Sequence, residues 1–488
     1  MKNNLQAIIL AAGKSSRFKT NHSKLLEKIC GQEMILYITK LLSGFEVQTT
    51  VVVGYKRELV EATVKNNHAE PINFVHQEQQ LGTGHALMCT QTFWERDHIL
   101  VLNGDMPLVT ADCIDTLYKK HIAQNADISF VVAHNIDPDL NSYGRVIQEG
   151  SSIKIIEAKD DTRENSEHCC INAGIYLFRK DFLEKNINEI SKSKVTGELY
   201  ITDLINIASK KGFKVETASA QVDIIRGINT LKELWAAEQI KRAEIIKHWM
   251  ERGVRFAFAQ NCHVDLNVKI EPGTNIGAGV QVYGTTTIDA NCKIEAFSIL
   301  DNAILQEGVT IRSHTIVKNS TIGKNSNVGP FAHIHTNTIV KENVAIGNFV
   351  EVKNSEIGDH SKAKHLSFLG DTQVGANTNI GAGTITCNYN GILKQRTIIK
   401  DNVFIGSNNC LIAPVTIGNN AFTAAGSVIT ENVPDYALAI ARAGQINKED
   451  YAKKLLDKNK QNIVFAVRDE VAIEDLVNSE ELDTLSSE

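Results

Sequence analysis

One segment near the start of the chain has residue types that suit the binding of phosphate groups. It reads LAAGKSSR at residues 10–17, and Lys24 follows shortly after it. Small residues allow backbone N–H groups to approach phosphate oxygens, and Arg17 and Lys24 supply the positive charge that a triphosphate requires. The same residues would also fit a tight turn with two solvated cations. The segment alone leaves both interpretations open.

Two further segments could complete a nucleotide site. In QEQQLGTGHA, Gly82 and Thr83 lie in a turn that opens a helix, where backbone amides and the side chain of Gln77 could bind a flat base. The alternative is a helix N-cap at Thr83, which needs no ligand. Asn103-Gly104-Asp105 follows an apolar strand, and a carboxylate there suits Mg²⁺, which binds proteins through one or two oxygens. Asp105 would otherwise be only a turn former.

The elements that would position these segments alternate between strand and helix. From about residue 5 to residue 226, short β-rich runs alternate with amphipathic helical patterns. This alternation predicts a Rossmann-like α/β domain with a mostly parallel sheet covered by helices. Ligands of such sheets gather at the carboxyl ends of the strands, where the polar segments fall. The expected strands include residues 7–10, 50–53, 72–75 and 99–102.

From about residue 264 to residue 428, single aliphatic residues return at every sixth position. This step fits neither a helix nor a half-buried strand, and it is typical of a hexapeptide solenoid. Glycine often follows the aliphatic residue, which eases a corner in the backbone. The residues that keep the step are Val264, Ile270, Ile276, Val282, Ile288 and Ile294 and, after a slip, Ile316, Ile322, Val328, Ile334, Val340, Ile346 and Val352.

The pattern predicts a parallel β-helix whose aliphatic residues point inward and stack from coil to coil. The spacing does not give its handedness, but resemblance to hexapeptide-repeat acyltransferases implies a left-handed β-helix. The step is interrupted at residues 358–373 and 387–396, which we expect to form loops on the outside. From the repeat alone, the β-helix could transfer acyl groups or could be only a rod for trimerisation.

Between the two patterns, residues 229–252 are predicted to form a long helix, with Gly253 as its C-cap. We interpret it as a rigid arm that also contributes to the core of the first domain. The predicted domains are residues 1–228 (the α/β domain), 229–253 (linker helix) and 254–455 (β-helix). Residues 456–488 form an acidic tail of low hydrophobicity, for which we predict disorder.

The three polar segments, in this order and at these strand ends, resemble nucleotidyltransferases that make nucleotide-diphosphate sugars. Further matches narrow the resemblance: Tyr143-Gly144-Arg145, Glu157 in IIEAKD, Asn172 in INAGI, the segment GELYITD at residues 197–203, and Asn229 in RGINT. With the hexapeptide repeats behind them, residues of about 5 to 455 resemble the bacterial bifunctional UDP-N-acetylglucosamine pyrophosphorylase/glucosamine-1-phosphate acetyltransferase family.

The resemblance implies roles for residues of the first site. Asp105 and Asn229 would ligate Mg²⁺, while Arg17 and Lys24 would be catalytic. Gly144, Glu157 and Asn172 would hold the sugar. The full set implied for UTP and UDP-N-acetylglucosamine is Leu10, Ala11, Ala12, Gly13, Lys24, Gln77, Gly82, Thr83, Asn103, Gly104, Asp105, Gly144, Glu157, Asn172 and Asn229.

It also implies a second site on the β-helix. His365, in SKAKHLSFLGD, matches the general base that takes a proton from the attacking amine, although a lone loop histidine is usually only solvated. A loop with Asn388 and Tyr389 would reach a neighbouring subunit of a homotrimer. The implied sugar-phosphate residues are His335, Lys353, Phe368 and Asn379, and those for acetyl-CoA are Ala382, Asn388, Tyr389, Ser407, Ala425 and Arg442.

Several positions depart from the family pattern. Ser15-Ser16 stands in place of the usual Gly-Thr, and Ser23 in place of a proline. His335 stands where an arginine usually binds the sugar phosphate, and a neutral imidazole cannot reproduce the two-pronged contact of a guanidinium. Phe368 stands where a tyrosine is usual, so a hydroxyl is missing. These changes leave open how much acetyl transfer remains.

Composition excludes several other classes of protein. A formal net charge of −6 gives no footprint for nucleic acid or an anionic membrane. The nine cysteines lack paired CxxC spacing and indicate reduced thiols. The first apolar run is too short for a signal peptide, and no stretch approaches the roughly 20 apolar residues of a membrane span. We therefore expect a cytoplasmic protein.

The sequence thus predicts a homotrimeric enzyme with two activities. Acetyl-CoA and glucosamine-1-phosphate would give N-acetylglucosamine-1-phosphate, which with UTP and Mg²⁺ would give UDP-N-acetylglucosamine, a precursor of bacterial envelope polysaccharides by family analogy. One alternative keeps only uridylyl transfer and makes the β-helix a trimerisation scaffold. Another is a non-catalytic nucleotide-sugar-binding assembly, against which Lys24, Asp105 and Asn229 argue.

Overall fold

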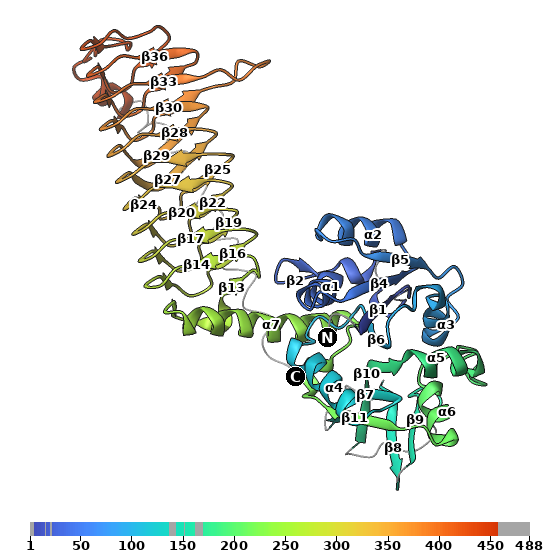
Figure 1. Ribbon diagram of the computed structural model, residues 1–488. Coiled ribbons are helices and arrows are strands. Elements are labelled where there is room, and N and C mark those ends of the chain that lie inside the picture. Colours follow the sequence, from blue (N-terminus) through green and yellow to red (C-terminus); the bar gives the residue numbers. More distant parts are fainter. Residues whose placement is uncertain are drawn as a thin grey trace, which may run out of the picture.

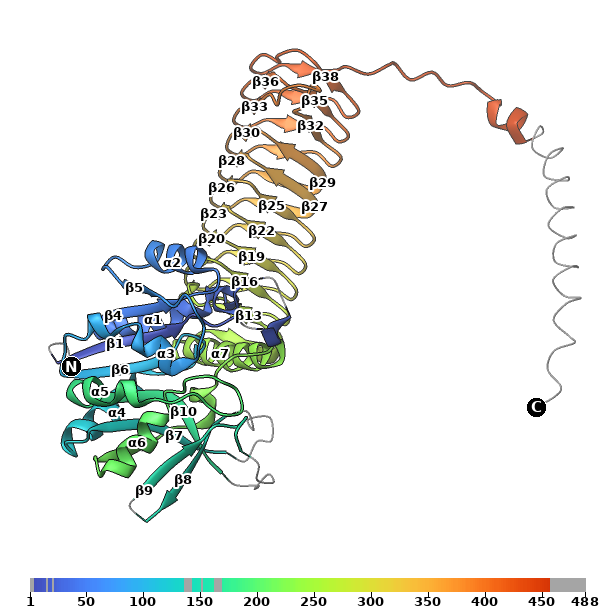
Figure 2. The same cartoon turned by 90° about the vertical axis from the view of Figure 1, so that its right-hand side faces the viewer.

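The computed structural model describes residues 4–14, 16–19, 22–135, 143–150, 152–161 and 169–456. A rounded α/β part is joined by the long helix α7 (Leu231–Glu251) to a straight prism of stacked coils (Figure 1). Seen from the side, the chain leaves the far end of the prism after its last coil (Figure 2). The predicted acidic tail, apart from Leu456, lies outside the described residues.

The α/β part is built on a sheet with the strand order β11-β7-β10-β6-β1-β4-β5. The four expected strands are confirmed as β1, β4, β5 and β6, which run parallel, so their carboxyl ends meet at one edge. Strand β10 is antiparallel to both neighbours. The strands are β1 (Leu5–Ala11), β4 (Gln48–Val53), β5 (Asn73–His76), β6 (His98–Asn103), β7 (Ile128–Asn135), β10 (Cys169–Arg179) and β11 (Val215–Ser219), with β8 (Arg145–Glu149) and β9 (Ser152–Ile156) as a hairpin beside β10.

Both faces of this sheet are buried, because side chains of a strand point alternately to either face. In β1, Ala7 and Ile9 belong to one apolar cluster and Ile8 belongs to the other. Helices provide the covering layers. They are α1 (Met34–Gly44), α2 (Arg57–Asn66), α3 (Thr83–Met88), α4 (Ala111–Ala123), α5 (Lys180–Asn186) and α6 (Asp203–Lys211).

Helix α7 begins and ends close to its predicted limits. Thr230 is the N-cap and accepts a hydrogen bond from Glu233 N–H at 3.2 Å. The Glu233 carboxylate in turn accepts from the backbone N–H of Asn229 at 2.7 Å, so this cap also fixes Asn229. At the other end Gly253 has φ +86° and donates to Met250 O, which confirms the predicted glycine cap.

The prism is a parallel β-helix with three faces, which we call A, B and C. Face A contains β12 (Arg255–Phe256), β15 (Asn275–Ile276), β18 (Lys293–Ile294), β21 (Thr310–Ile311), β24 (Asn327–Val328), β31 (Asn379–Ile380), β34 (Phe404–Ile405), β37 (Phe422–Thr423) and β39 (Leu438–Ala439). Face B contains β13 (His263–Val264), β16 (Gln281–Tyr283), β19 (Ile299–Asp301), β22 (Ile316–Lys318), β25 (His333–His335), β32 (Ile385–Cys387), β35 (Cys410–Ile412) and β38 (Val428–Ile429). The nine-residue strands β27 (Ala345–Lys353) and β29 (Lys362–Gly370) cross the corner from A to B.

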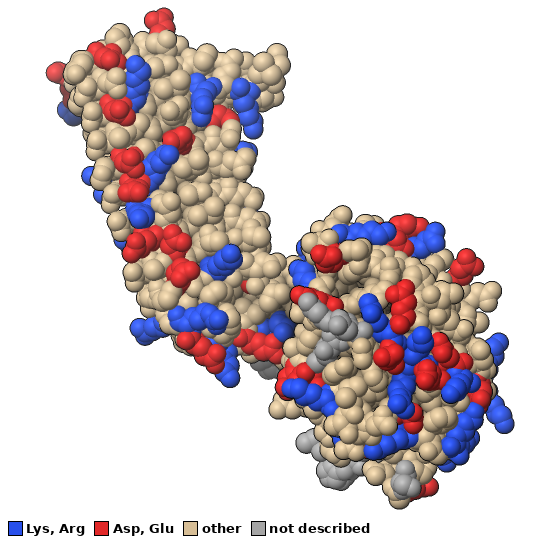
Figure 3. Space-filling model, viewed as in Figure 1, with Lys and Arg blue, Asp and Glu red and all other residues tan. Residues whose placement is uncertain are grey.

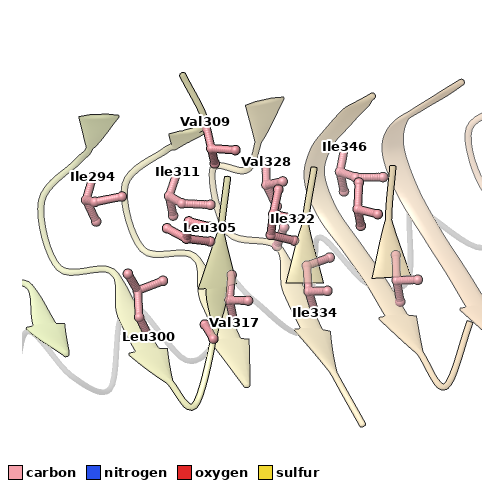
Figure 4. Packing of buried hydrophobic residues seen from close by; sticks show 14 of the residues in the cluster. Ile294, Leu300, Leu305, Val309, Ile311, Val317, Ile322, Val328, Ile334 and Ile346 are labelled. Carbon is pink, nitrogen blue, oxygen red and sulfur yellow. The ribbon is translucent and has the colours of Figure 1, made fainter. Parts of the chain in front are cut away.

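Face C is a separate sheet of parallel strands. It contains β14 (Lys269–Ile270), β17 (Thr287–Ile288), β20 (Ile304–Leu305), β23 (Thr321–Ile322), β26 (Ile339–Val340), β28 (Glu356–Ile357), β30 (Thr372–Val374), β33 (Thr397–Ile399) and β36 (Val415–Ile417). Most of the short strands turn one aliphatic side chain inward, and these residues stack along the axis, as Ile294, Ile311, Val328 and Ile346 do (Figure 4). Strands β32 and β37 instead turn Thr386 and Thr423 inward. Each six-residue step in the sequence therefore forms one face of one coil.

Two expectations about the step are wrong in detail. At the slip, Val317 is fully buried and its neighbour Ile316 points outward, because some coils are one residue shorter than others. Residues 358–373 are not an outside loop, because the buried Ala363 and Leu369 keep the step and β29 stays paired with β27. The second interruption is confirmed, since residues 388–396 form an arm that projects from the prism (Figure 1).

The corner between faces A and B differs from the other corners. Elsewhere, left-handed backbone positions are filled mostly by asparagine and glycine, which tolerate positive φ. Here four consecutive coils place large rings at such positions, with φ between +54° and +59° and adjacent ring centroids 5.0 to 5.5 Å apart. We call this the aromatic corner; it consists of Phe297, His314, Phe331 and Phe349.

The α/β part and the β-helix share a continuous apolar core. One cluster includes Met34 and Ile228 of the α/β part, Ile245 and Ile246 of α7, and the inward residues of the β-helix as far as Val433. The hairpin of β2 (Lys28–Ile29) and β3 (Gln32–Glu33) also touches the first coil, since Leu266 N–H donates to Cys30 O at 2.9 Å. None of the helices among the described residues is long and apolar enough to cross a bilayer.

Candidate functional sites

A cleft of about 660 Å³ opens at the carboxyl ends of β1 and β6. The polar segments predicted from the sequence meet there, because these parallel strands are neighbours. The predicted residues that line the cleft are Leu10, Ala11, Ala12, Gly13, Arg17, Lys24, Gln77, Gly82, Thr83, Asn103, Asp105 and Asn229. Ser15, one of the departures from the family pattern, lies outside the described residues.

Lys24 is the centre of the polar contacts in this cleft. Its ammonium lies 2.5 Å from the Asp105 carboxylate and 2.9 Å from Asn229 Oδ1. Lys24 begins the 3₁₀ turn η2 (Lys24–Leu26), Asp105 follows β6, and Asn229 precedes α7, so three distant segments converge on one point. The side chains of Lys24 and Asp105 are 12% and 17% exposed, which leaves them partly shielded from water.

The same two oxygens fit a divalent cation. Asp105 and Asn229 present a carboxylate and an amide oxygen to one positive charge, and both are hard ligands of the kind that Mg²⁺ accepts. Few protein ligands suffice for Mg²⁺, which keeps several waters and also binds substrate phosphates. The residues predicted as metal ligands are therefore brought together and suit the ion.

The Gly82-Thr83-Gly84 turn is held against the segment around Leu199. Gly84 N–H donates to Leu199 O at 2.7 Å, and Leu199 N–H donates to Leu81 O at 2.8 Å. Gly82 has φ +111°, and a Cβ on it would lie 2.5 Å from Leu199 O, so this position requires glycine. The alternative interpretation of Thr83 as an N-cap is wrong, because Thr83 is the first residue of α3 and its hydroxyl accepts from Ile201 N–H.

Two glutamines fix the loops around the cleft. Gln77 is 4% exposed and donates to Gly82 O at 3.1 Å, which fixes its amide beside the glycine turn. Gln80, which sequence reasoning did not select, donates to Ala12 O and accepts from Lys14 N–H. It thereby ties the second polar segment to the first. Its only signal in the sequence was its place inside QEQQLGTGHA.

Lys159 and Glu198 also line the cleft and were missed. They form an ion pair at 3.5 Å between the segment after β9 and the segment before α6. Both lie next to residues of the recognised motifs IIEAKD and GELYITD, but nothing in their spacing indicates that the two segments touch. This pair joins two segments at the wall of the cleft.

Four predicted residues do not line the cleft. Gly104 packs against Ile35 and Ala11, so it serves the turn. Glu157, near the hairpin of β8 and β9, accepts a hydrogen bond from Thr202 Oγ1 at 2.6 Å, and burial raises the pKa of its carboxyl group. Asn172 is 7% exposed and donates to Tyr176 Oη, while its N–H donates to Gly144 O. Gly144, Glu157 and Asn172 thus form a second, buried layer beside the cleft.

His365 lies at the corner between faces A and B, in the long strand β29. Its Nδ1 lies 3.1 Å from Asn348 Oδ1, and the two residues are register partners in β29 and β27. A carbonyl oxygen only accepts, so Nδ1 carries the hydrogen and Nε2 of the neutral ring keeps its lone pair. Nε2 is then the atom that can take a proton. Asn348 was missed, although it precedes His365 by the length of one coil.

The residues predicted to meet acetyl-CoA continue the line of His365 along the same corner. Ala363, Ile380, Ile405 and Thr423 are successive register partners. Two residues after each of them come His365, Ala382, Ser407 and Ala425, which therefore occupy equivalent positions in consecutive coils. Arg442 lies at the end of this line, with its Cδ 4.0 Å from the Cβ position of Gly426. We call this line the small-residue track; it consists of Ala382, Ser407 and Ala425.

The predicted sugar-phosphate residues are divided between two faces. His335, Lys353 and Phe368 point outward on face B, beside the corner that carries His365. The ring of Phe368 lies over Gly370, whose Cβ would be 2.6 Å from its para carbon. Asn379 lies on face A, where it pairs with Lys362. One chain therefore does not bring Asn379 together with the other three.

The projecting arm carries the remaining predicted residues. Asn388, at its base, donates to the Asp371 carboxylate at 2.5 Å, and its amide nitrogen lies 2.8 Å from the Cβ position of Gly370. Tyr389 is 60% exposed, and Ile392 and Leu393 further along are 84% and 63% exposed. Asn388 is thus held by Asp371 of its own chain, whereas the tip of the arm is exposed and projects from the prism (Figure 1).

Comparisons with known proteins match both parts of the chain. Residues 7–150 match the MobA-like NTP transferase domain, residues 259–360 the GMPPB C-terminal domain, and residues 396–431 the bacterial transferase hexapeptide with six repeats. The bifunctional protein GlmU of Caldanaerobacter subterraneus subsp. tengcongensis is 37% identical over 460 residues, or 93% of this chain and 99% of the relative. The GlmU proteins of Fervidobacterium nodosum and Thermotoga petrophila are each 39% identical over 92% of this chain and cover 97% and 99% of their own lengths.

The chain belongs to the bifunctional GlmU family. It is a transferase that combines a Rossmann-like nucleotidyltransferase domain with a left-handed β-helix of hexapeptide repeats, as the resemblance implied. The similarity to GlmU extends over α7 and both candidate sites. The structure therefore contains one candidate site for each of the two activities of a bifunctional protein. His335 and Phe368, the two departures within the predicted acetyltransferase site, both lie on face B.

Proposed function

We propose that the chain makes UDP-N-acetylglucosamine in two steps. The β-helix transfers the acetyl group of acetyl-CoA to glucosamine-1-phosphate, and the α/β domain then joins N-acetylglucosamine-1-phosphate to UTP with release of pyrophosphate. The observation that carries this proposal is the presence of two separate sites in one chain. The cleft converges on Lys24, Asp105 and Asn229, and the distant corner carries His365.

In uridylyl transfer, a phosphate oxygen of the sugar phosphate attacks the α-phosphorus of UTP and pyrophosphate leaves. As in other phosphoryl transfers, the protein contributes mainly position and charge neutralisation. Arg17 and Lys24 face the triphosphate, the backbone of residues 10–13 contacts its oxygens, and Gln77 with Gly82 holds the base. A bound Mg²⁺, held by Asp105 and Asn229, supplies further positive charge to the phosphates.

In acetyl transfer, the amine of glucosamine-1-phosphate attacks the thioester carbonyl carbon. A C–N bond forms, the C–S bond breaks, and the thiolate of CoA leaves and takes up a proton. Nε2 of His365 accepts the proton that the amine loses, while Asn348 holds the ring in the required tautomer. The small-residue track leaves room beside His365 for the pantetheine chain, with Arg442 near the phosphates of CoA.

The acetyltransferase site would be completed in a homotrimer. Hexapeptide repeats indicate oligomerisation, and two further features support a site shared between chains. Phe331 and Phe349 of the aromatic corner are 49% and 58% exposed, and Phe349 directly follows Asn348, the register partner of His365. Asn379 and the tip of the arm point away from the face B residues of their own chain. In the view of Figure 3, a broad stretch of the prism also lacks charged side chains.

We expect the double substitution Phe331→Asn, Phe349→Asn to convert the trimer to monomers. Each ring would forfeit about 1 to 2 kcal/mol of apolar burial between chains. Asparagine tolerates the left-handed backbone of both positions, so the isolated chain should not lose thermal stability. Light scattering checks the mass, and a thermal melt checks the stability. A variant that stays trimeric, or a monomer that melts much earlier, would contradict the proposed role of the corner.

We expect Phe368→Tyr to strengthen binding of the sugar phosphate. The added hydroxyl would stand beside Gly370 and Asn388 on face B, where it can donate to a phosphate or sugar oxygen. One such hydrogen bond should lower the KM for glucosamine-1-phosphate by about two- to tenfold. The measurement is thiol release from acetyl-CoA as a function of sugar phosphate. An unchanged or raised KM would mean that this position does not face the substrate.

The test of both activities uses one preparation of the full chain. Thiol release from acetyl-CoA should depend on glucosamine-1-phosphate, and pyrophosphate release from UTP should depend on N-acetylglucosamine-1-phosphate. The departures at His335 and Phe368 favour a second candidate, uridylyl transfer alone with the β-helix as scaffold. Pyrophosphate release without sugar-dependent thiol release would establish that candidate. If a folded trimer shows neither pyrophosphate release nor thiol release, both enzymatic functions would be excluded.

A further inference from the structure

Face B carries a cluster of metal-ligating side chains, of which only His335 has a predicted role, in binding the sugar phosphate. His333, His335 and Glu351 each offer one ligand atom, and these atoms all lie within 4.8 Å of one another. Within the described ranges of the chain, no other group of three such residues comes this close. The cluster is thus a feature of this β-helix and not of the cleft that holds Asp105.

The backbone fixes this cluster rigidly. His333 and His335 are two residues apart in β25, so both point outward, and Glu351 lies on the next coil as the register partner of His333. The two imidazole rings are stacked with centroids 4.1 Å apart. Nε2 of His335 lies 3.0 Å from Glu351 Oε1, and Nδ1 lies 2.9 Å from Thr336 Oγ1. A hydrogen bond on the second nitrogen is typical of metal-ligating histidines.

From this arrangement we propose that His333, His335 and Glu351 bind a first-row divalent metal ion such as Zn²⁺, and that this ion binds the phosphate of the sugar substrate. Two imidazoles and one carboxylate are usual ligands of Zn²⁺, and three protein ligands leave a position open for an outside oxygen. The inference that the ion binds the substrate phosphate rests on the proposed acetyltransferase activity, whereas the inference that the cluster binds a metal ion does not.

The surrounding charges explain why metal and phosphate would bind together. Lys318 and Lys353 flank His335 on the preceding and following coils and act on His333 electrostatically. With a divalent ion present, the ammonium groups of Lys318 and Lys353 oppose its charge, and the carboxylates of Glu351 and, one coil before Lys318, Asp301 compensate for only part of the positive charge. A phosphate group of nearly two negative charges restores the balance. Binding of the two ligands is therefore coupled, and each should raise the affinity for the other.

The metal would also supply what the departure at His335 removes. An arginine at this position offers a two-pronged positive contact to phosphate, which a neutral imidazole does not. A metal ion held by that imidazole provides positive charge at the same place. Lys353, the register partner of His335, lies beside it on the same face.

The first experiment measures metal binding without turnover. The full chain, freed of metal with a chelator, is titrated with Zn²⁺ by calorimetry and with Co²⁺ by absorption spectroscopy. We expect one site per chain that is lost in His333→Asn and in His335→Asn. It should remain in the control His360→Asn, a corner position between Asn343 and Asn377 where asparagine is the neighbouring residue type. Inorganic phosphate should raise the Zn²⁺ affinity about tenfold.

Binding that both face B substitutions leave unchanged would assign the metal to thiols or to the cleft and would overturn the proposal, as would no binding at all. If phosphate does not change the Zn²⁺ affinity, the inference that the ion binds the substrate phosphate would be overturned. His335→Arg gives an independent check, because it removes a ligand and adds a charge. It should abolish the Zn²⁺ site and make the KM for glucosamine-1-phosphate insensitive to chelator. If the wild type shows no acetyl transfer, the Zn²⁺ and phosphate titrations still decide the metal site.

Discussion

Replacing Asp105 by asparagine is expected to lower uridylyl transfer by at least about a hundredfold. The substitution preserves the shape of the turn after β6 but removes the negative charge that pairs with Lys24 and that a divalent cation requires. The Lys24 ammonium would keep Asn229 Oδ1 as an acceptor but would lose its ion pair with the carboxylate at position 105. Pyrophosphate release from UTP and N-acetylglucosamine-1-phosphate measures the effect, and it should be followed as Mg²⁺ is raised.

Two comparisons make this result specific. Asp115→Asn is the matched control, because Asp115 pairs with Lys119 on the surface of α4 and is not among the residues that line the cleft. It should retain full uridylyl transfer. Acetyl transfer by the Asp105 variant should be unchanged, since His365 lies on the β-helix. A variant that reaches the wild-type rate at the same Mg²⁺ concentration would show that Asp105 is not a metal ligand.

The second large effect is expected for His365→Ala, which should lower the rate of acetyl transfer by about 10²- to 10⁴-fold. Without the imidazole, the amine has no positioned group to take its proton as the C–N bond forms. The KM values for both substrates should change little, because the ring is assigned to proton transfer. Thiol release at saturating substrate measures the effect. His360→Asn is the control, and uridylyl transfer by the same preparation verifies the fold.

Substitutions of Asn348 can show whether its contact with His365 positions the base or is only structural. Asn348→Ala removes the acceptor for Nδ1 of His365 and should lower kcat about tenfold at unchanged KM. Asn348→Asp keeps an acceptor and should restore most of the rate. Equal loss in both variants, or a loss expressed in KM, would show that the contact does not orient the base.

The α/β part was predictable because its signals are local. A glycine turn after an apolar strand marks a strand end, and parallel strands collect such ends at one edge, so Lys24 and Asp105 could be expected together. Lys159 and Glu198 could not be placed in this way. Their contact depends on how a hairpin beside β10 meets the segment before α6, and no pattern in the sequence records that meeting.

The sequence predicts the β-helix architecture, but it predicts less well which residue of each strand points inward. At Ile316-Val317 two aliphatic residues are adjacent, and only the length of the coil decides that the second points inward. Ala363 points inward, but its side chain is too small to continue the aliphatic pattern, so the sequence predicts a loop where β29 lies. The partner of His365 could have been found, since residues one coil apart lie against each other in a solenoid.

The continuous core has a consequence for how heat should inactivate the protein. In a solenoid each coil is stabilised only by its neighbours, so fraying starts at the end that lacks a support. The first coil is anchored to α7 and to the β2–β3 hairpin, whereas the chain leaves the last coil as an exposed segment (Figure 2). The coils with Ser407 and Ala425 therefore melt first. As the temperature rises, acetyl transfer should therefore be lost before uridylyl transfer.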